Sequence, residues 1–180
     1  SVRCVLLHPR MFLSTRQARG ILTRLVDLSD VVWQTANLAG FLAGCYTNDL
    51  ALIRAAFEDV LIEPQRAKLI PGFRHAKRAA VEAGALGCSI SGAGPSVFAW
   101  CEAGSAEAVR EAMLGAFRGE WLDCDHWVAP IGGDGARVGR VARVLVLQTR
   151  RSEGDAIIEG RLGRQLAAHR FRRRRAAVVA

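Results

Sequence analysis

Short apolar runs alternate, over the first 138 residues, with longer segments in which apolar residues recur every three or four positions. The short runs are rich in β-branched residues and end near proline, glycine or charged residues, which is the pattern of strands. The predicted strands cover residues 3–8, 86–90, 97–102 and about 127–131.

The longer segments have the spacing of amphipathic helices and begin at residues that commonly cap a helix. Ser14 and Gln17 form a capping-box pattern, in which Ser14 accepts from the amide three residues on and Gln17 reaches back. Pro71 suits a first helical turn, and Gly84 suits the end of that helix. The predicted helices cover about 15–24, 29–45, 50–61, 71–84 and 106–117.

The order of these elements is one strand, several helices, two strands, a helix and a last strand. This order predicts an α+β fold of the ferredoxin-like, split β-α-β type, an antiparallel sheet covered by helices. With 180 residues, 51% of them hydrophobic, the chain is long enough for one domain with a proper core. We assign that domain to residues 1–138.

The formal net charge of +8 lies entirely in the remaining residues, 139–180. This tail holds eleven arginines and three acids, whereas residues 1–138 hold equal numbers of basic and acidic side chains. A charge run without sustained periodicity is typical of a disordered segment. Contact with nucleic acid or an acidic membrane, and an aberrant extension through a frame change, are the alternatives. The balanced body has no electrostatic footprint for nucleic acid.

The five cysteines are odd in number, scattered and without a CxxC pair, which argues against a disulfide framework and a zinc site. We expect free thiols and a cytoplasmic protein. Cys124 and His126 have no second pair of ligands, so no metal site is expected. No apolar run approaches the roughly 18 residues of a membrane span, and the first residues lack a signal-peptide pattern.

The strongest local signal is the glycine-rich segment Ser91-Gly92-Ala93-Gly94-Pro95-Ser96 between two predicted strands. Glycines let a backbone turn tightly and approach a ligand, and successive free amides make a concave anion site. The plain alternative is a hairpin loop that only connects the strands. The segment is neither a Walker loop nor a dinucleotide fingerprint.

This segment, read on as SGAGPSVFA, resembles the third motif of the GHMP kinases, which include galactokinase, mevalonate kinase and homoserine kinase. Further blocks resemble the carboxyl-terminal half of the homoserine kinases in the same order. They lie at residues 8–9, 14–19, 38–41, 63–66, 69–73 and 135–138. The resemblance covers about residues 5–138 and implies that the chain is the carboxyl-terminal half only.

The resemblance implies that Thr15, Arg19 and Arg66 bind the amino-acid substrate. Thr15 and Arg19 are four residues apart and share one helix face, and guanidinium groups grip a carboxylate through paired hydrogen bonds. Taken singly, the two arginines also fit surface or salt-bridge roles, and Thr15 fits a helix start. Glu63 is expected to pair with a nearby arginine and hold its loop.

The resemblance also implies that the glycine-rich loop lies close to the transferred phosphate. The loop residues concerned are Ser91, Gly92, Ala93, Gly94 and Ser96.

The implied activity is ATP-dependent phosphorylation of the L-homoserine hydroxyl to O-phospho-L-homoserine, a step toward threonine, with ATP and Mg²⁺ as cofactors. No segment resembles the family's P-x-x-x-GLGSSA phosphate loop. The resemblance therefore places that loop and the magnesium ligand in a missing amino-terminal half, and we assign no catalytic residue or metal ligand here. We expect the isolated chain to be inactive.

The expected partners are L-homoserine, ATP and the amino-terminal kinase half, with a homodimer left open and no membrane partner. One rival interpretation is another GHMP kinase acting on a mevalonate-type or sugar alcohol. The other is a non-catalytic protein whose basic tail binds nucleic acid.

Overall fold

The computed structural model of the protein describes residues 1–132, 136–141 and 144–149, with side chains over residues 1–132. The chain divides into two compact units, Ser1–Ile131 and Gly132–Ala180. The first unit contains the glycine-rich segment and the predicted binding residues.

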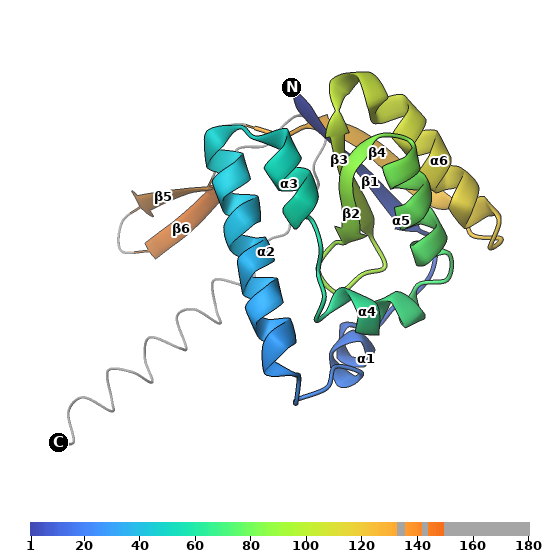
Figure 1. Ribbon diagram of the computed structural model, residues 1–180, viewed down its shortest axis with the longest axis horizontal. Helices are drawn as coiled ribbons and strands as arrows, with labels where there is room; N and C mark the ends of the chain where they lie inside the picture. The colour runs from blue at the N-terminus through green and yellow to red at the C-terminus, as the bar shows by residue number, and fades with distance from the viewer. Residues whose placement is uncertain (133–135, 142–143, 150–180) are drawn as a thin grey trace. The chain divides into compact units, whose positions relative to one another are not determined.

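A four-stranded antiparallel sheet forms the centre of the first unit, with the strand order β2-β3-β1-β4 (Figure 1). Its strands are β1 (Val2–Pro9), β2 (Ala85–Ile90), β3 (Val97–Glu102) and β4 (Cys124–Pro130). The central pairing places Val5 opposite Ala99 on β3 and opposite Val128 on β4. The predicted α+β architecture with an antiparallel sheet and covering helices is therefore confirmed, and the strand order is that of the split β-α-β type.

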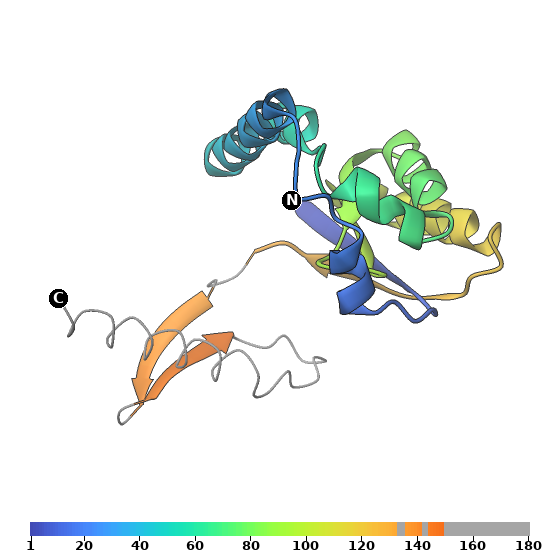
Figure 2. The same ribbon diagram turned by 90° about the horizontal axis from the view of Figure 1, so that it is seen from below.

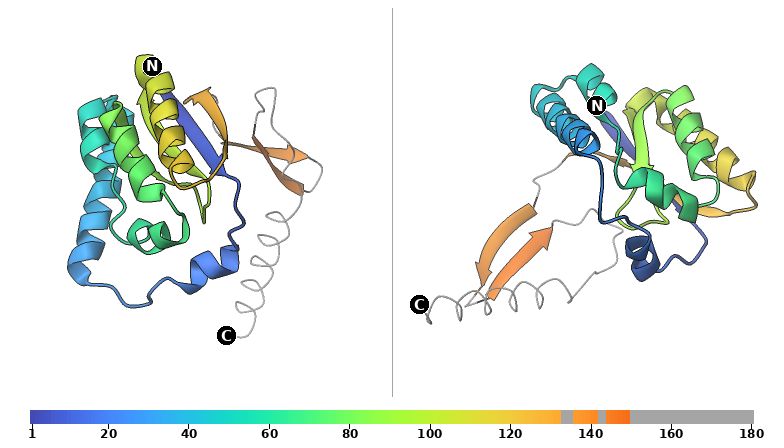
Figure 3. Two further views of the ribbon diagram at one scale, coloured as in Figure 1. Left: turned by 90° about the vertical axis from the view of Figure 1, so that its right-hand side faces the viewer. Right: turned by 60° about the horizontal axis from the view of Figure 1, so that its bottom comes forward.

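One face of the sheet is buried under α5 (Phe73–Glu82) and α6 (Ala106–Arg118) (Figure 3). Because side chains alternate along a strand, every second residue of β1 and β3 points to this face. These positions are fully buried together with large helix side chains. The group includes Val5, Leu7, Val97, Ala99, Cys101, Phe73, Met113 and Phe117.

The opposite face is partly covered by the antiparallel helices α2 (Leu28–Thr47) and α3 (Leu50–Ala56), seen on the other side of the sheet in Figures 2 and 3. The contact is aromatic. Phe57 packs against Phe98 and Trp100 of β3 with ring centroids 5.9 and 5.7 Å apart, and Phe41 of α2 lies 5.1 Å from Trp100.

Asn48 and Asp49 form the turn between these two helices. Asn48 adopts a left-handed conformation, and the Asp49 carboxylate accepts from the Leu52 amide.

The predicted third helix ends earlier than its apolar spacing indicates, at Ala56 rather than residue 61. The chain leaves helical angles at Phe57, and beyond it the Asp59 carboxylate accepts from the amides of Leu61 and Ile62 at 2.9 and 2.7 Å, so these amides are taken from a continuing helix. Such side-chain bonds compete with helix continuation. A single turn follows, α4 (Glu63–Arg66), then a 3-10 turn η1 (Ala67–Leu69).

The first and fourth predicted helices are also shorter than expected. The first, α1, runs only over Thr15–Gly20, and Ser14 accepts from the amide two residues on, at Arg16, rather than three. The fourth, α5, begins at Phe73, after Gly72 in a left-handed conformation, so Pro71 precedes the helix. A short 3-10 turn, η2 (Ala103–Ser105), leads into α6.

The second unit contains two antiparallel strands, β5 (Ala136–Val141) and β6 (Val144–Thr149). The sequence pattern did not predict this pair. The expectation of a disordered tail from residue 139 falls partly on these strands, and for residues 142–143 and 150–180 it lies outside the described residues.

Candidate functional site

The side chain of Arg66 joins three segments that are far apart in the sequence. From α4 its Nε donates to the Ala18 carbonyl on α1 at 3.2 Å, and its Nη1 donates to the Gly92 carbonyl in the glycine-rich loop at 2.7 Å. The Gln65 side chain reinforces the junction, because its Oε1 accepts from the Thr23 amide at 2.8 Å. The structure therefore brings Arg66 and the predicted loop into direct contact.

The loop itself is a tight connection between β2 and β3. The Ser91 amide donates to the Ser96 carbonyl at 2.8 Å, and the Gly94 amide donates to the Ser91 carbonyl at 3.0 Å. Gly94 has a φ of +83°, and an added Cβ would lie 2.9 Å from Ile70 and 3.2 Å from Leu13. Only glycine fits this position, because both the backbone angle and the space exclude a side chain.

The apex of the loop stays open. Ser91 and Gly92 are exposed, while Pro95 is buried and anchors the base of the loop. Ser96 is held from below, since its hydroxyl lies 2.8 Å from Nδ1 of His8 on β1. Because the Ser91 and Gly94 amides donate within the loop and Pro95 has no N–H, the apex can present only the Gly92 and Ala93 amides to an anion, while the base of the loop stays fixed.

Thr15 and Arg19 lie on α1, close in sequence to the Arg66 contact at Ala18. Ala18 is fully buried, whereas Thr15 and Arg19 are exposed. The helix therefore turns its small residue inward and directs these two polar side chains to solvent. Arg66 differs from them, because it is half-buried and already holds two backbone acceptors.

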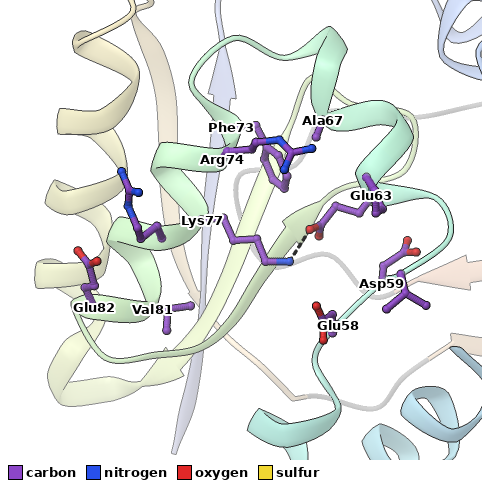
Figure 4. Close-up of a pocket in the computed structure, with 12 residues that line it drawn as sticks. Glu58, Asp59, Glu63, Ala67, Phe73, Arg74, Lys77, Val81 and Glu82 are labelled. Carbon is purple, nitrogen blue, oxygen red and sulfur yellow. Dashed lines mark hydrogen bonds and ion pairs between the residues drawn. The ribbon is translucent and has the colours of Figure 1, made fainter. Parts of the chain in front are cut away.

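Glu63 anchors the other end of the α4 turn, and its partner is not the arginine that the sequence predicts. Its carboxylate pairs with Lys77 of α5, not with an arginine, and it also accepts from the Ser89 hydroxyl of β2 at 2.6 Å. Figure 4 shows Glu63 and Lys77 pointing toward one another across a hollow between α4 and α5. Lys77 and Ser89 were not predicted, because nothing in their spacing marks them.

The described residues do not gather a metal site. Within residues 1–132 and the two strands of the second unit, no group of three or more His, Cys, Asp or Glu side chains could hold a metal ion. Nor does any helix in this part of the chain have the length and apolar character needed to cross a membrane.

The chain is similar in sequence and fold to kinases of the GHMP family. The sequence profile described as "GHMP kinases C terminal" matches residues 41–119. The homoserine kinase of Xylella fastidiosa (strain M12) is 52% identical over 135 residues, which cover 74% of this chain and 42% of that protein. The homoserine kinase of Chlorobium phaeovibrioides is 46% identical over 138 residues, which cover 75% of this chain and 43% of that protein.

A crystal structure of homoserine kinase from Cytophaga hutchinsonii superimposes with a TM-score of 0.70 at 40% identity, covering 72% of this chain and 41% of that one. This chain thus spans less than half the length of the relatives that it matches.

Proposed function

This chain belongs to the GHMP kinase family, of which it carries the C-terminal domain, and we propose that it supplies the homoserine-binding part of a homoserine kinase. The reaction is ATP-dependent transfer of a phosphoryl group to the side-chain hydroxyl of L-homoserine, giving O-phospho-L-homoserine. The observation that carries the proposal is the Arg66 junction, in which one guanidinium joins α1 to the glycine-rich loop.

Arg66 keeps enough donors to bind a substrate. A guanidinium has five N–H donors, and two of those of Arg66 are used on the carbonyls of Ala18 and Gly92. The others can hold the α-carboxylate of an amino acid, with Arg19 and Thr15 of α1 as the second binding group. A carboxylate held in two places fixes the direction of the substrate side chain.

The Arg66 guanidinium contacts the glycine-rich loop, so the loop is within reach of the reacting hydroxyl of a small substrate bound to that guanidinium. We assign to Ser91, Gly92, Ala93, Gly94 and Ser96 the stabilisation of negative charge near the transferred phosphoryl group. The Gly92 and Ala93 amides suit this role, because they do not donate within the loop as those of Ser91 and Gly94 do, and fixed dipoles need no reorganisation during the reaction. Phosphoryl transfer depends mostly on such positioning and electrostatic stabilisation.

The cofactors require residues beyond this domain. ATP supplies the phosphoryl group and Mg²⁺ neutralises the charge of its phosphates, and no segment of this sequence resembles the phosphate loop of the family. We therefore propose that the phosphate loop and the magnesium ligand belong to an amino-terminal half of the kind that accounts for the remaining length of the relatives.

The proposal can be tested in a grafted kinase. Residues of this chain replace the matching 135-residue segment of the Xylella fastidiosa homoserine kinase, to which they are 52% identical. We expect the graft to form O-phospho-L-homoserine from ATP and L-homoserine, measured by mass spectrometry, and not to phosphorylate mevalonate. A folded graft that is inactive with homoserine, or that prefers mevalonate, would contradict the proposal.

Within the graft, Arg66→Ala should raise the KM for L-homoserine about 10- to 100-fold, because charge-assisted hydrogen bonds to the carboxylate are lost. The KM for ATP should change far less. Arg78→Ala is the matched control, since Arg78 is an exposed arginine on α5. Equal effects of the two substitutions on the homoserine KM would remove Arg66 from the binding site.

A further inference from the structure

The α4 turn is too short to hold its own conformation. It has four residues, Glu63–Arg66, and a single turn fixes several backbone angles for very few hydrogen bonds. Its position must therefore come from tertiary contacts. The Glu63 carboxylate makes two of these contacts.

Glu63 is buried, with 8% of its surface exposed, and both of its carboxylate oxygens are engaged. Oε1 pairs with Lys77 Nζ, and Oε2 accepts from Ser89 Oγ at 2.6 Å. Lys77 belongs to α5, which covers one face of the sheet, and Ser89 belongs to the edge strand β2. The carboxylate thus ties α4 to a helix and to a strand at the same point.

The two contacts direct α4 toward the site, because β2 leads into the glycine-rich loop. Ser89 precedes Ser91, the first residue of the loop, by two residues. The Gly92 carbonyl of the loop accepts from Arg66, which is the last residue of α4. Glu63 begins α4 and Arg66 ends it, so a displacement of the first residue moves the last. The result is a closed ring of contacts through Glu63, Ser89, Gly92 and Arg66.

We propose that Glu63 is a positioning residue for Arg66: its contacts with Lys77 and Ser89 hold α4 so that the Arg66 guanidinium lies against the Gly92 carbonyl. Glu63 does not contact the substrate in this scheme. The effect on homoserine binding rests on the proposed function, whereas the effect on Arg66 itself does not.

The first test uses the full 180-residue chain and measures hydrogen exchange of the Arg66 Nε–H by NMR. In Glu63→Ala we expect this exchange to become at least about tenfold faster, the size expected when a charge-assisted hydrogen bond loosens. Glu63→Gln keeps the shape and should give an intermediate rate. Ser89→Ala, which removes one small contact, covers the case in which Glu63→Ala fails to fold.

Glu82→Ala is the matched control, because Glu82 is an exposed acid that lines the same hollow on α5. It should leave the Arg66 exchange rate unchanged. If Glu63→Gln and Ser89→Ala leave the Arg66 exchange rate unchanged as this control does, Glu63 does not position Arg66.

The second test places the same substitutions in the grafted kinase. Glu63→Gln should raise the KM for L-homoserine about fivefold or more while the kcat at saturation changes little, as expected for weakened ground-state binding. A purely structural role would lower the amount of active enzyme without moving the KM, and that result would overturn the proposal. If the unsubstituted graft does not phosphorylate homoserine, the proposed function fails, and the exchange measurement alone decides the role of Glu63.

Discussion

The two faces of the central sheet are covered in different ways. On the face under α5 and α6, alternate residues of β1 and β3 are fully buried against Phe73, Met113 and Phe117. On the face under α2 and α3, the corresponding residues Phe98 and Trp100 are only partly buried. Both faces follow from the same alternation of side chains, so the difference lies in the helices.

The helix α2 shows the difference most clearly. Its inner side packs on α3 through close approaches at Gly40 and Gly44, and the Gln34 and Asn37 side chains bond the backbone after α3. Its other sides leave large apolar side chains in solvent. They include Leu28, Val32, Trp33, Leu38, Leu42 and Tyr46.

The comparison indicates that stability is concentrated on the α5–α6 face, while the α2–α3 pair depends on a few aromatic contacts. Regions with fewer buried apolar contacts open at lower free energy than the core. Within the core cluster, burial raises the pKa of the Cys88 thiol to about 12.

The largest effect should come from Phe117→Ala. Phe117 is fully buried on α6, and removing a buried aromatic ring costs about 3–5 kcal/mol of unfolding free energy. Urea unfolding of the full chain, followed by circular dichroism, measures the loss. A loss smaller than that of the Gly87→Ala substitution would contradict the ranking of the two faces.

An intermediate effect is expected for Gly87→Ala on the other face. An added Cβ would lie 2.2 Å from Cγ of Phe57, so the ring must move and α3 with it. Overpacking of this kind costs about 1–3 kcal/mol. Amide hydrogen exchange should accelerate in α2 and α3 and stay unchanged in α5 and α6.

Gly115→Ala is the control for this substitution, because nothing lies within 4 Å of an added Cβ at that position on α6. Alanine favours a helix over glycine by about 1 kcal/mol, so this variant should be at least as stable as the original. Equal destabilisation by both substitutions would show that the contact with Phe57 is not the cause.

The smallest effect should come from Asp125→Asn, which breaks an exposed pair between the end of β1 and β4. Arg10 Nη2 lies 2.8 Å from Asp125 Oδ1, and the two side chains are 64% and 44% exposed. The hydrogen bond from Arg10 lowers the pKa of Asp125 below its ordinary value of 3.8. A lowered pKa stabilises the folded state above that ordinary value, and the contribution is lost as the pH falls through the folded value.

The variant should therefore have a slightly lower free energy of unfolding than the original chain at neutral pH, and this difference should disappear in acid. The difference is small because exposed ion pairs are weak and screened by solvent. Unfolding midpoints of the two chains at both pH values measure it. A deficit that persists or grows in acid would contradict this assignment.

Much of the fold could be predicted from the sequence, because the strands and the longer helices carry clear periodicities. The end of α3 could not be predicted, since Phe57 and Val60 continue the apolar spacing of the helix. In the structure the Asp59 side chain instead bonds the amides of Leu61 and Ile62. The β5–β6 pair was also missed, because each strand is recognisable only through the partner that it meets.

The site could be predicted only in part. Arg66 and the glycine-rich loop were named through family resemblance, and their contact is a finding of the structure. The substrate-binding roles of Thr15, Arg19 and Arg66 stay predictions. The predicted arginine partner of Glu63 was wrong. Residue spacing does not reveal that α5 and β2 bring Lys77 and Ser89 to the Glu63 carboxylate.

The central position of β1 in the sheet has a consequence for folding during synthesis. Its neighbours in the sheet are β3 and β4, so Val5 meets Ala99 and Val128, both made long after it. Contacts so distant along the chain slow folding, because a large loop must close before they form. During translation β1 can therefore pair with β3 and β4 only after nearly the whole domain has left the ribosome.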